Sequence, residues 1–153
     1  MLSKSSIRFA LVLGSQLVLI ALGMEVLCRL FIGHTPELEE DPRFGKITKA
    51  HTAIVQSFEG HSAAHTNALG NLDDEMPVQL PPDSVMVLGD SFTEARHVAR
   101  ANRFTDLLAE RTSRRVWNVG HAGWSPVNAL GYLEANRGKF APKTVILQVS
   151  SND

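Results

Sequence analysis

The chain has 153 residues, which allows one domain of ordinary size but not two such domains beside a membrane segment. Its 15 Lys and Arg residues against 16 Asp and Glu residues give a formal charge of -1, so the composition disfavours nucleic acid as a partner. The single cysteine, Cys28, excludes a disulfide within the chain.

The amino-terminal segment predicts a transmembrane helix over residues 9–32. Lys4 and Arg8 precede a largely apolar run that is long enough to cross a bilayer. Glu25 and Arg29 interrupt this run, but their i, i+4 spacing lets them pair on one helix face. Because the positive residues come first, we expect residues 1–8 in the cytoplasm and the rest of the chain, after the helix, on the periplasmic or extracellular side.

Two other interpretations of this segment remain open. Ala21, Leu22 and Gly23 suit the small-residue site of a cleavable signal peptide, although the apolar residues continue past them. A buried helix of a soluble protein is the other alternative, and the uninterrupted length disfavours it. Lipidation of Cys28 is not expected, because the residues before it are not small.

Residues 33–82 predict an extracytoplasmic lead-in or linker. Polar and turn-forming residues dominate this region, and helical periodicity is absent. Short stretches such as residues 52–55 suit edge strands. We interpret the rest as a spacer or a loosely packed lead-in.

Two groups of residues in this lead-in invite a metal hypothesis. The adjacent acids Asp73, Asp74 and Glu75 point in different directions, which is typical of a solvated loop. His61 and His65 would align on a helix, but their surroundings do not favour a helix and no third ligand is evident. We therefore expect exposed side chains here and no metal site.

Strands and helices alternate over residues 83–153. Strands are predicted at residues 85–88, 116–119 and 144–149, with helices at residues 101–111 and 126–138. Ser125 and Pro126 mark the start of the second helix, since serine caps well and proline suits the first helical position. This order indicates a parallel α/β sheet with right-handed crossovers.

The first strand is followed by residues with catalytic potential. Gly89 permits a sharp turn, and Asp90 or Ser91 can cap the helix that follows. Ser91 then lies at the carboxyl end of a strand, where α/β sheets place their chemistry. A capped turn without catalysis is the alternative for this triplet by itself.

Three blocks of the chain resemble those of the SGNH (GDSL) hydrolase family. Residues 87–93 look like the first block, whose serine is the nucleophile for ester cleavage. Residues 118–123 and 150–153 are similar to the second and third blocks, and residues 66–73 resemble a lead-in of membrane-anchored members. The resemblance implies a three-layer, flavodoxin-like sheet with the Ser91 strand at the switch point.

The resemblance also assigns roles to single residues. It implies Ser91 as the nucleophile and Asp90 as support for its turn. Gly123 and Asn152 would supply the oxyanion hole, with Gly120 as the competing assignment for Gly123. No metal or organic cofactor is implied.

The chain departs from the family pattern in several places. Family members often carry glycines where this chain has Ala95 and His97, so the helix after Ser91 is expected to begin differently. Ser150 replaces the glycine of the third block. The family's general base is a histidine in a late Asp-x-x-His block, which has no counterpart here.

Neither of the two histidines in the second half of the chain is expected to be the base. We expect His97 and His121 to be exposed or locally hydrogen-bonded. The 153-residue chain is accordingly expected to be an amino-terminal piece of a longer protein, with an incomplete SGNH domain over residues 83–153 and no activity of its own.

The complete protein is expected to be a serine esterase acting on acyl esters. An outward-facing anchored domain favours acylated envelope polysaccharide as the substrate. Two alternatives remain: an O-acyltransferase, in which a sugar hydroxyl replaces water as acceptor, and a non-catalytic binding or assembly protein that keeps the SGNH scaffold.

Overall fold

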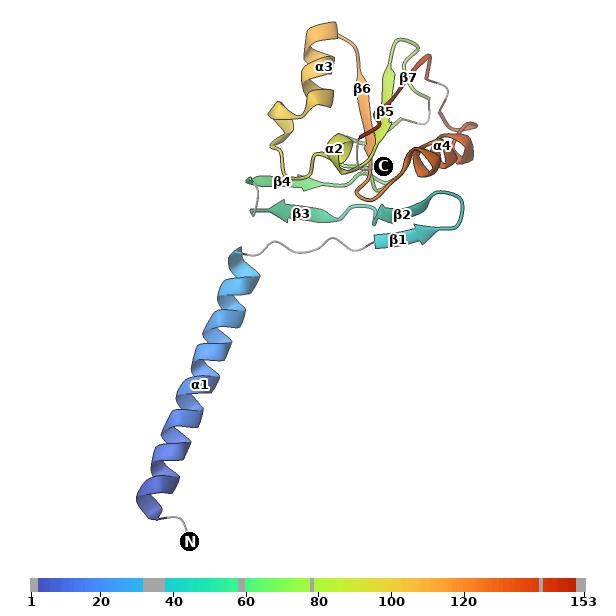
Figure 1. Ribbon diagram of the computed structural model, residues 1–153. Helices are drawn as coiled ribbons and strands as arrows, with labels where there is room; N and C mark the ends of the chain where they lie inside the picture. Colours follow the sequence, from blue (N-terminus) through green and yellow to red (C-terminus); the bar gives the residue numbers. More distant parts are fainter. Residues whose placement is uncertain (1–2, 32–37, 58–59, 78, 141, 151–153) are drawn as a thin grey trace. The chain divides into compact units, whose positions relative to one another are not determined.

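The computed structural model of the protein describes residues 3–31, 38–57, 60–77, 79–140 and 142–150 (Figure 1). The chain divides into two compact units, Met1–Gly33 and His34–Asp153. The first unit holds one long helix, and the second holds every strand and the remaining helices of the described residues.

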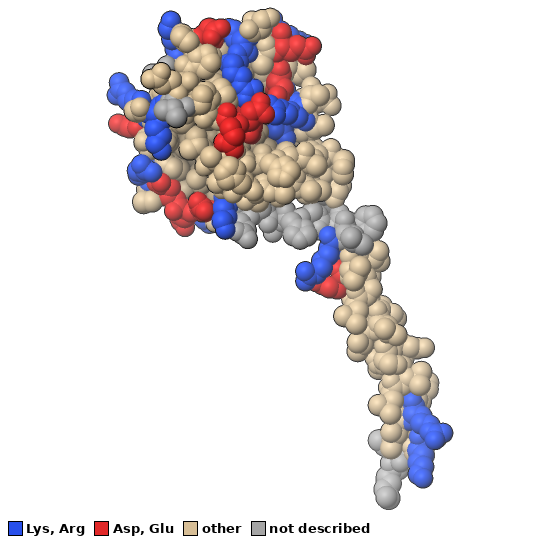
Figure 2. Space-filling model, turned by 180° about the vertical axis from the view of Figure 1, so that it is seen from behind, with Lys and Arg blue, Asp and Glu red and all other residues tan. Residues whose placement is uncertain are grey.

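The amino-terminal unit is the helix α1, Lys4–Phe31. An 18-residue window within Lys4–Arg29 has a mean hydropathy of 2.1, and the helix is long and apolar enough to cross a membrane. At 1.5 Å per residue, 28 residues extend about 42 Å, more than the roughly 30 Å of a hydrocarbon core. Charged side chains gather near its two ends (Figure 2). There Glu25 and Arg29 form the expected ion pair, 2.7 Å apart.

The second unit is built on a three-stranded parallel sheet. Its strands are β5 (Val85–Gly89), β6 (Val116–Gly120) and β7 (Thr144–Leu147), in the order β6-β5-β7. The register pairs Gly89 with Gly120 and Leu88 with Leu147. The carboxyl ends of all three strands therefore lie at one edge of the sheet. The parallel α/β sheet predicted from the sequence is confirmed.

Helices cover both faces of the central strand. Met86 and Leu88 pack in one cluster with Ala129 and Tyr132 of α4 (Pro126–Ala135). Because side chains alternate along a strand, Val85 and Val87 face the other way, against Leu108 and Ala109 of α3 (Phe104–Thr112). Figure 1 shows α3 and α4 on opposite sides of the sheet. This double burial explains why β5 is apolar throughout.

The helices begin and end at residues with clear physical reasons. The short helix α2, Ser91–Glu94, is capped by Asp90, which accepts the Phe92 N–H at 2.8 Å. Its last residue, Glu94, is followed by the C-cap Ala95, whose φ of 49° lies in the left-handed region that glycine adopts more easily. After the short 3₁₀ helix η1, Arg100–Asn102, α3 begins at Phe104, within the range predicted for this helix.

The start of α4 agrees with the prediction from Ser125 and Pro126. The Asn128 side chain accepts from both the N–H and the hydroxyl of Ser125, at 2.9 and 2.6 Å. The helix ends at Ala135 rather than residue 138. Asn136 turns its side-chain amide back onto the Tyr132 carbonyl, at 2.9 Å, which competes with further helical bonding.

Residues 38–65 of the lead-in carry four short strands, and the edge strand predicted near residues 52–55 is one of them, β3. The strands form two antiparallel hairpins, β1 (Leu38–Asp41) with β2 (Gly45–Thr48), and β3 (Ala53–Gln56) with β4 (Ser62–His65). Phe44, in the first hairpin turn, is buried with Trp124 and Tyr132 at ring distances of 6.1 and 5.1 Å. An isolated apolar residue between polar ones has no periodicity, so the sequence did not indicate this packing.

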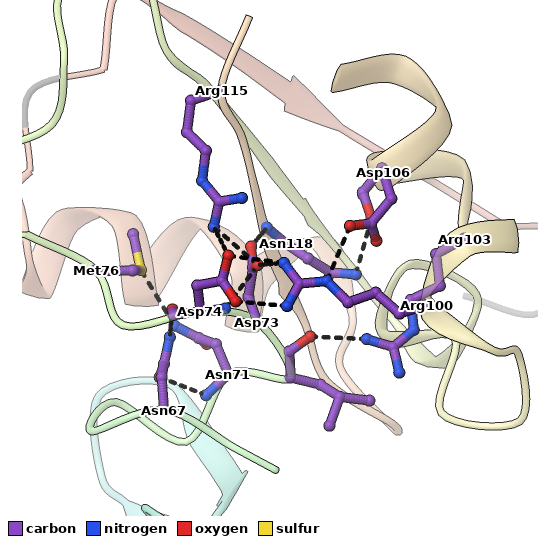
Figure 3. A network of polar contacts seen from close by, with 12 residues as sticks. Asn67, Asn71, Asp73, Asp74, Met76, Arg100, Arg103, Asp106, Arg115 and Asn118 are labelled. Atoms are coloured by element: carbon purple, nitrogen blue, oxygen red, sulfur yellow. Dashed lines mark hydrogen bonds and ion pairs between the residues drawn. The ribbon is translucent and has the colours of Figure 1, made fainter. Parts of the chain in front are cut away.

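Residues 73–75 were expected to form a solvated loop, and this expectation was wrong for Asp73. Its side chain is only 7% exposed and accepts the backbone N–H of Asn118 at 2.8 Å. Strand β6 is an edge strand, so its outward N–H needs a partner, and this carboxylate supplies one. Arg115 and Arg100 approach the same carboxylate at 3.0 and 3.3 Å (Figure 3).

Two opposing effects act on this carboxylate. Burial raises the pKa of Asp73, while the Asn118 N–H and the two arginines act in the opposite direction.

Asp74 and Glu75 are exposed, as are His51, His61 and His65. Among the described residues, no group of three His, Cys, Asp or Glu side chains could hold a metal ion.

Candidate active site

The loops after the three strands bring predicted site residues to one edge of the sheet. Ser91 follows β5 as the first residue of α2, and its side chain is exposed. Gly123 lies in the exposed loop after β6. Asn152 lies outside the described residues. From the same third block, the Ser150 hydroxyl donates to the Asp90 carboxylate, so the loops after β5 and β7 are in contact.

Asp90 holds this turn together from a buried position. One carboxylate oxygen accepts the Phe92 N–H and the other accepts the Ser150 hydroxyl. The side chain is 4% exposed. Asp90 therefore fixes the backbone on which Ser91 is carried, and of the two capping residues considered from the sequence it is the one that caps α2.

The short helix α2 is tied to strand β6 and to the loops after β6 and β7. Thr93 donates its hydroxyl to the Gln148 side chain, just beyond β7, at 2.9 Å. Asn118 of β6 donates its side-chain amide to the Thr93 carbonyl at 2.7 Å. The Glu94 carboxylate accepts the N–H of Ala122, in the loop after β6, at 3.1 Å. Ser91 thus lies on an element that is held from both sides.

Sequence reasoning missed the roles of Thr93, Glu94 and Asn118. Thr93 and Glu94 are almost completely buried, although polar residues after a helix cap are usually solvated. A one-turn helix is too short to show a periodic pattern, so their inward direction has no signature in the sequence.

Gly120 has a packing role and no free N–H. Its N–H donates to the Asn118 side-chain oxygen at 3.0 Å. A Cβ atom at this position would lie 2.2 Å from the Glu94 nitrogen and 2.6 Å from the Thr93 carbonyl carbon. Glycine is therefore required here so that α2 can approach β6.

Gly123 is the better donor of the two glycines. In its turn, the His121 N–H donates to the Gly89 carbonyl at 3.1 Å, and the Ala122 N–H donates to Glu94. The Trp124 N–H donates back to the His121 carbonyl at 3.1 Å. Within the described ranges, the Gly123 N–H is the one of these four without an acceptor. Its φ of 81° suits glycine, and a Cβ atom at this position would have nothing within 4 Å.

A shallow apolar hollow adjoins this edge of the sheet. It has a volume of about 460 Å³ and is lined by Phe92, Phe104, Gln148 and Ser150. Phe92 follows Ser91 directly and is 64% exposed. The hollow therefore lies against the residue that directly follows Ser91 in the chain.

His121 is neither exposed nor locally hydrogen-bonded, because it is a buried histidine whose partner lies 50 residues away. Its ring is buried, with Nε2 2.9 Å from the Asn71 side-chain oxygen and the Trp124 ring 4.3 Å away. Asn71 also donates to the Tyr132 hydroxyl at 3.2 Å. Burial, with a smaller effect of Arg96, lowers the pKa of His121 to about 3, so the ring is neutral at pH 7.

This buried histidine predicts a pH dependence of stability. Between pH 6.5 and 3 the unfolded chain binds a proton on His121 that the folded chain does not, so the free energy of unfolding falls as pH is lowered. We expect a slope of about 1 kcal/mol per pH unit between pH 6 and 5 from this group. Urea unfolding at pH 7, 6 and 5 measures it.

The matched variants for this measurement are His121→Gln and His61→Gln. The first removes the buried titrating group and should flatten the slope over this range, whatever its effect on stability at pH 7. The second replaces an exposed histidine and should leave the slope unchanged. Equal slopes in all three proteins would contradict the assignment of His121 as a neutral buried ring.

The fold and the site together define an α/β protein that presents an exposed serine at the carboxyl edge of a parallel sheet. Comparisons of the chain with protein-family models, curated proteins and solved structures gave no match. Its function is therefore inferred from its residues and their geometry.

Proposed function

We propose that the protein is a serine esterase of the SGNH type, with Ser91 as its nucleophile. The observation that carries this proposal is the pairing of an exposed serine after the central strand with the Gly123 N–H after the neighbouring strand, which has no acceptor among the described residues. A nucleophile and an oxyanion donor on adjacent loops are the two parts that acyl transfer needs first.

The proposed reaction begins with attack of the Ser91 hydroxyl oxygen on the ester carbonyl carbon. The carbonyl oxygen becomes an oxyanion and accepts hydrogen bonds from the N–H groups of Ser91 and Gly123. The Asn152 amide is the third donor that the resemblance implies. The proton of the hydroxyl passes to a general base and then to the departing alcohol. Water then cleaves the acyl-enzyme and releases the acid and the free serine.

The base in this scheme is the histidine of the late family block. His121 is unsuited to that role, because it is buried, hydrogen-bonded to Asn71 and neutral down to low pH. Asp90 supports the reaction indirectly, since it fixes the turn that carries Ser91. No metal or organic cofactor enters the scheme.

The substrate class follows from the surroundings of Ser91. The apolar hollow beside it suits the acyl group of an ester. We further propose that α1 anchors the protein with residues 1–8 in the cytoplasm and the sheet outside, which makes acylated envelope polysaccharide the natural substrate. The exposure of Ser91 leaves room for a polymer hydroxyl, so an O-acyltransferase is the second candidate.

Covalent labelling tests this proposal. The natural full-length protein, solubilised in detergent, is incubated with a fluorophosphonate probe, digested and mapped by mass spectrometry. We expect one adduct, on Ser91, together with hydrolysis of a short-chain aryl acetate. A labelled residue elsewhere would reject Ser91 as the nucleophile, and absence of both labelling and turnover would favour the non-catalytic scaffold.

Hydrolysis and transfer are separated by the acceptor. Acyl-enzyme formation is common to both, so an added sugar acceptor should leave the acylation rate unchanged. Under the transferase hypothesis it diverts the acyl group from water to the sugar, which mass spectrometry of the products detects. Release of free acid alone would leave the esterase as the remaining catalytic candidate.

A further inference from the structure

We propose that Glu94 is a positioning residue that holds the Gly123 N–H in place opposite Ser91. This inference rests on the proposed esterase function. Glu94 is the last residue of α2, three residues after Ser91, and its side chain is 1% exposed. It reaches across to the loop after β6, which carries Gly123.

The contacts of this carboxylate divide between two partners. Arg96 donates to Oε1 at 2.6 Å and to Oε2 at 3.0 Å, which neutralises the buried charge. Oε2 also accepts the Ala122 N–H at 3.1 Å. The ion pair of Glu94 with Arg96 forms within one segment and does not require Ala122. The bond to Ala122 is therefore a separate contact, which links α2 to the loop after β6.

The turn that carries Gly123 depends on such links. A side chain at Gly123 would meet nothing within 4 Å among the described residues, so no packing of its own holds this residue. Its place is set by its two neighbours: Trp124 is buried in the aromatic cluster, and exposed Ala122 is held by the bond from its N–H to Glu94. Since the Ala122 and Gly123 Cα atoms are about 3.8 Å apart, an anchor at one fixes the other closely.

Two substitutions separate positioning from simple charge pairing. Glu94→Gln keeps a side-chain oxygen at the same reach, so it can still accept the Ala122 N–H, but it loses the charge that pairs with Arg96. Glu94→Asp keeps the charge but withdraws the oxygens by roughly 1.5 Å, the length of one C–C bond. Positioning predicts that Asp is the more harmful change for catalysis.

The measurement is steady-state kinetics of the full-length protein on an aryl acetate. The rates are divided by the concentration of reactive serine, which fluorophosphonate labelling measures. We expect Glu94→Asp to lower kcat by about 10- to 100-fold with KM within about twofold, because a misplaced donor weakens only the transition state. Glu94→Gln should keep kcat within about threefold of the wild type. The reverse order, or equal kcat in all three proteins, would overturn the inference.

Controls make each outcome interpretable. Glu110→Gln changes an exposed glutamate of α3 and should leave kcat unchanged. If Glu94→Asp does not fold, Arg96→Met provides the second test, since it removes the charge partner but leaves Glu94 at full reach. It should keep kcat within about threefold, and a 10-fold loss would assign the effect to the ion pair.

The failure of this inference is distinct from the failure of the proposed function. A wild-type protein that neither labels at Ser91 nor turns over would reject the esterase itself. A wild-type protein that labels and turns over, with kcat insensitive to Glu94→Asp, would reject only the positioning role.

Discussion

Replacement of Ser91 by alanine is expected to lower kcat/KM of the full-length protein for an aryl acetate by about 10⁴-fold or more. The hydroxyl oxygen is the atom that forms the acyl-enzyme in the proposed reaction, and alanine offers no replacement. The residual rate would come from substrate binding and the oxyanion donors alone. Fluorophosphonate labelling should be lost in parallel.

Stability should be nearly unchanged by Ser91→Ala, because the side chain is exposed and Asp90, not Ser91, caps the helix. The thermal unfolding midpoint therefore serves as the internal control. Ser6→Ala, at an exposed serine of α1, is the matched control for activity. A Ser91→Ala protein that is folded and still active would contradict the nucleophile assignment.

Replacement of Gly120 by alanine is expected to destabilise the second unit by about 3 kcal/mol or more. The added Cβ would lie 2.2 Å from the Glu94 nitrogen and 2.6 Å from the Thr93 carbonyl carbon. Both of these neighbours are backbone atoms, so α2 would have to move away from β6. Chemical unfolding of the full-length protein, monitored by Trp fluorescence, measures the loss.

Gly138→Ala is the matched control for this measurement. No atom of the described residues lies within 4 Å of a Cβ at Gly138, so the same chemical change should alter the unfolding free energy by less than about 0.5 kcal/mol. If Gly120→Ala unfolded at the same denaturant concentration as Gly138→Ala, the close approach of α2 to β6 would be incorrect.

The elements that the sequence predicted correctly are those with local signatures. Strand β5 is a continuous apolar run between turn residues, and the start of α4 is marked by Ser125 and Pro126. The ion pair of Glu25 and Arg29 needs only helical spacing. These features depend on residues within one or two turns, so they can be derived without knowing the fold.

The errors concern residues whose partners lie far along the chain. Asp73 was expected in solvent, but its partner is the N–H of Asn118, 45 residues away. Phe44 was placed in a spacer, but it packs with Trp124 and Tyr132. The preference for Gly123 over Gly120 came only from the resemblance, because the tertiary structure decides which N–H group already has an acceptor.

By itself, the sequence determined that an apolar helix precedes an α/β unit and that a serine follows the first buried strand. Only the tertiary structure decided that Glu94 and Thr93 turn inward, that Gly123 keeps an unused N–H, and that His121 is a buried neutral ring. The physical reason is that hydrogen bonding and burial are properties of contacts between loops, whereas apolar patterns and caps are properties of a single segment.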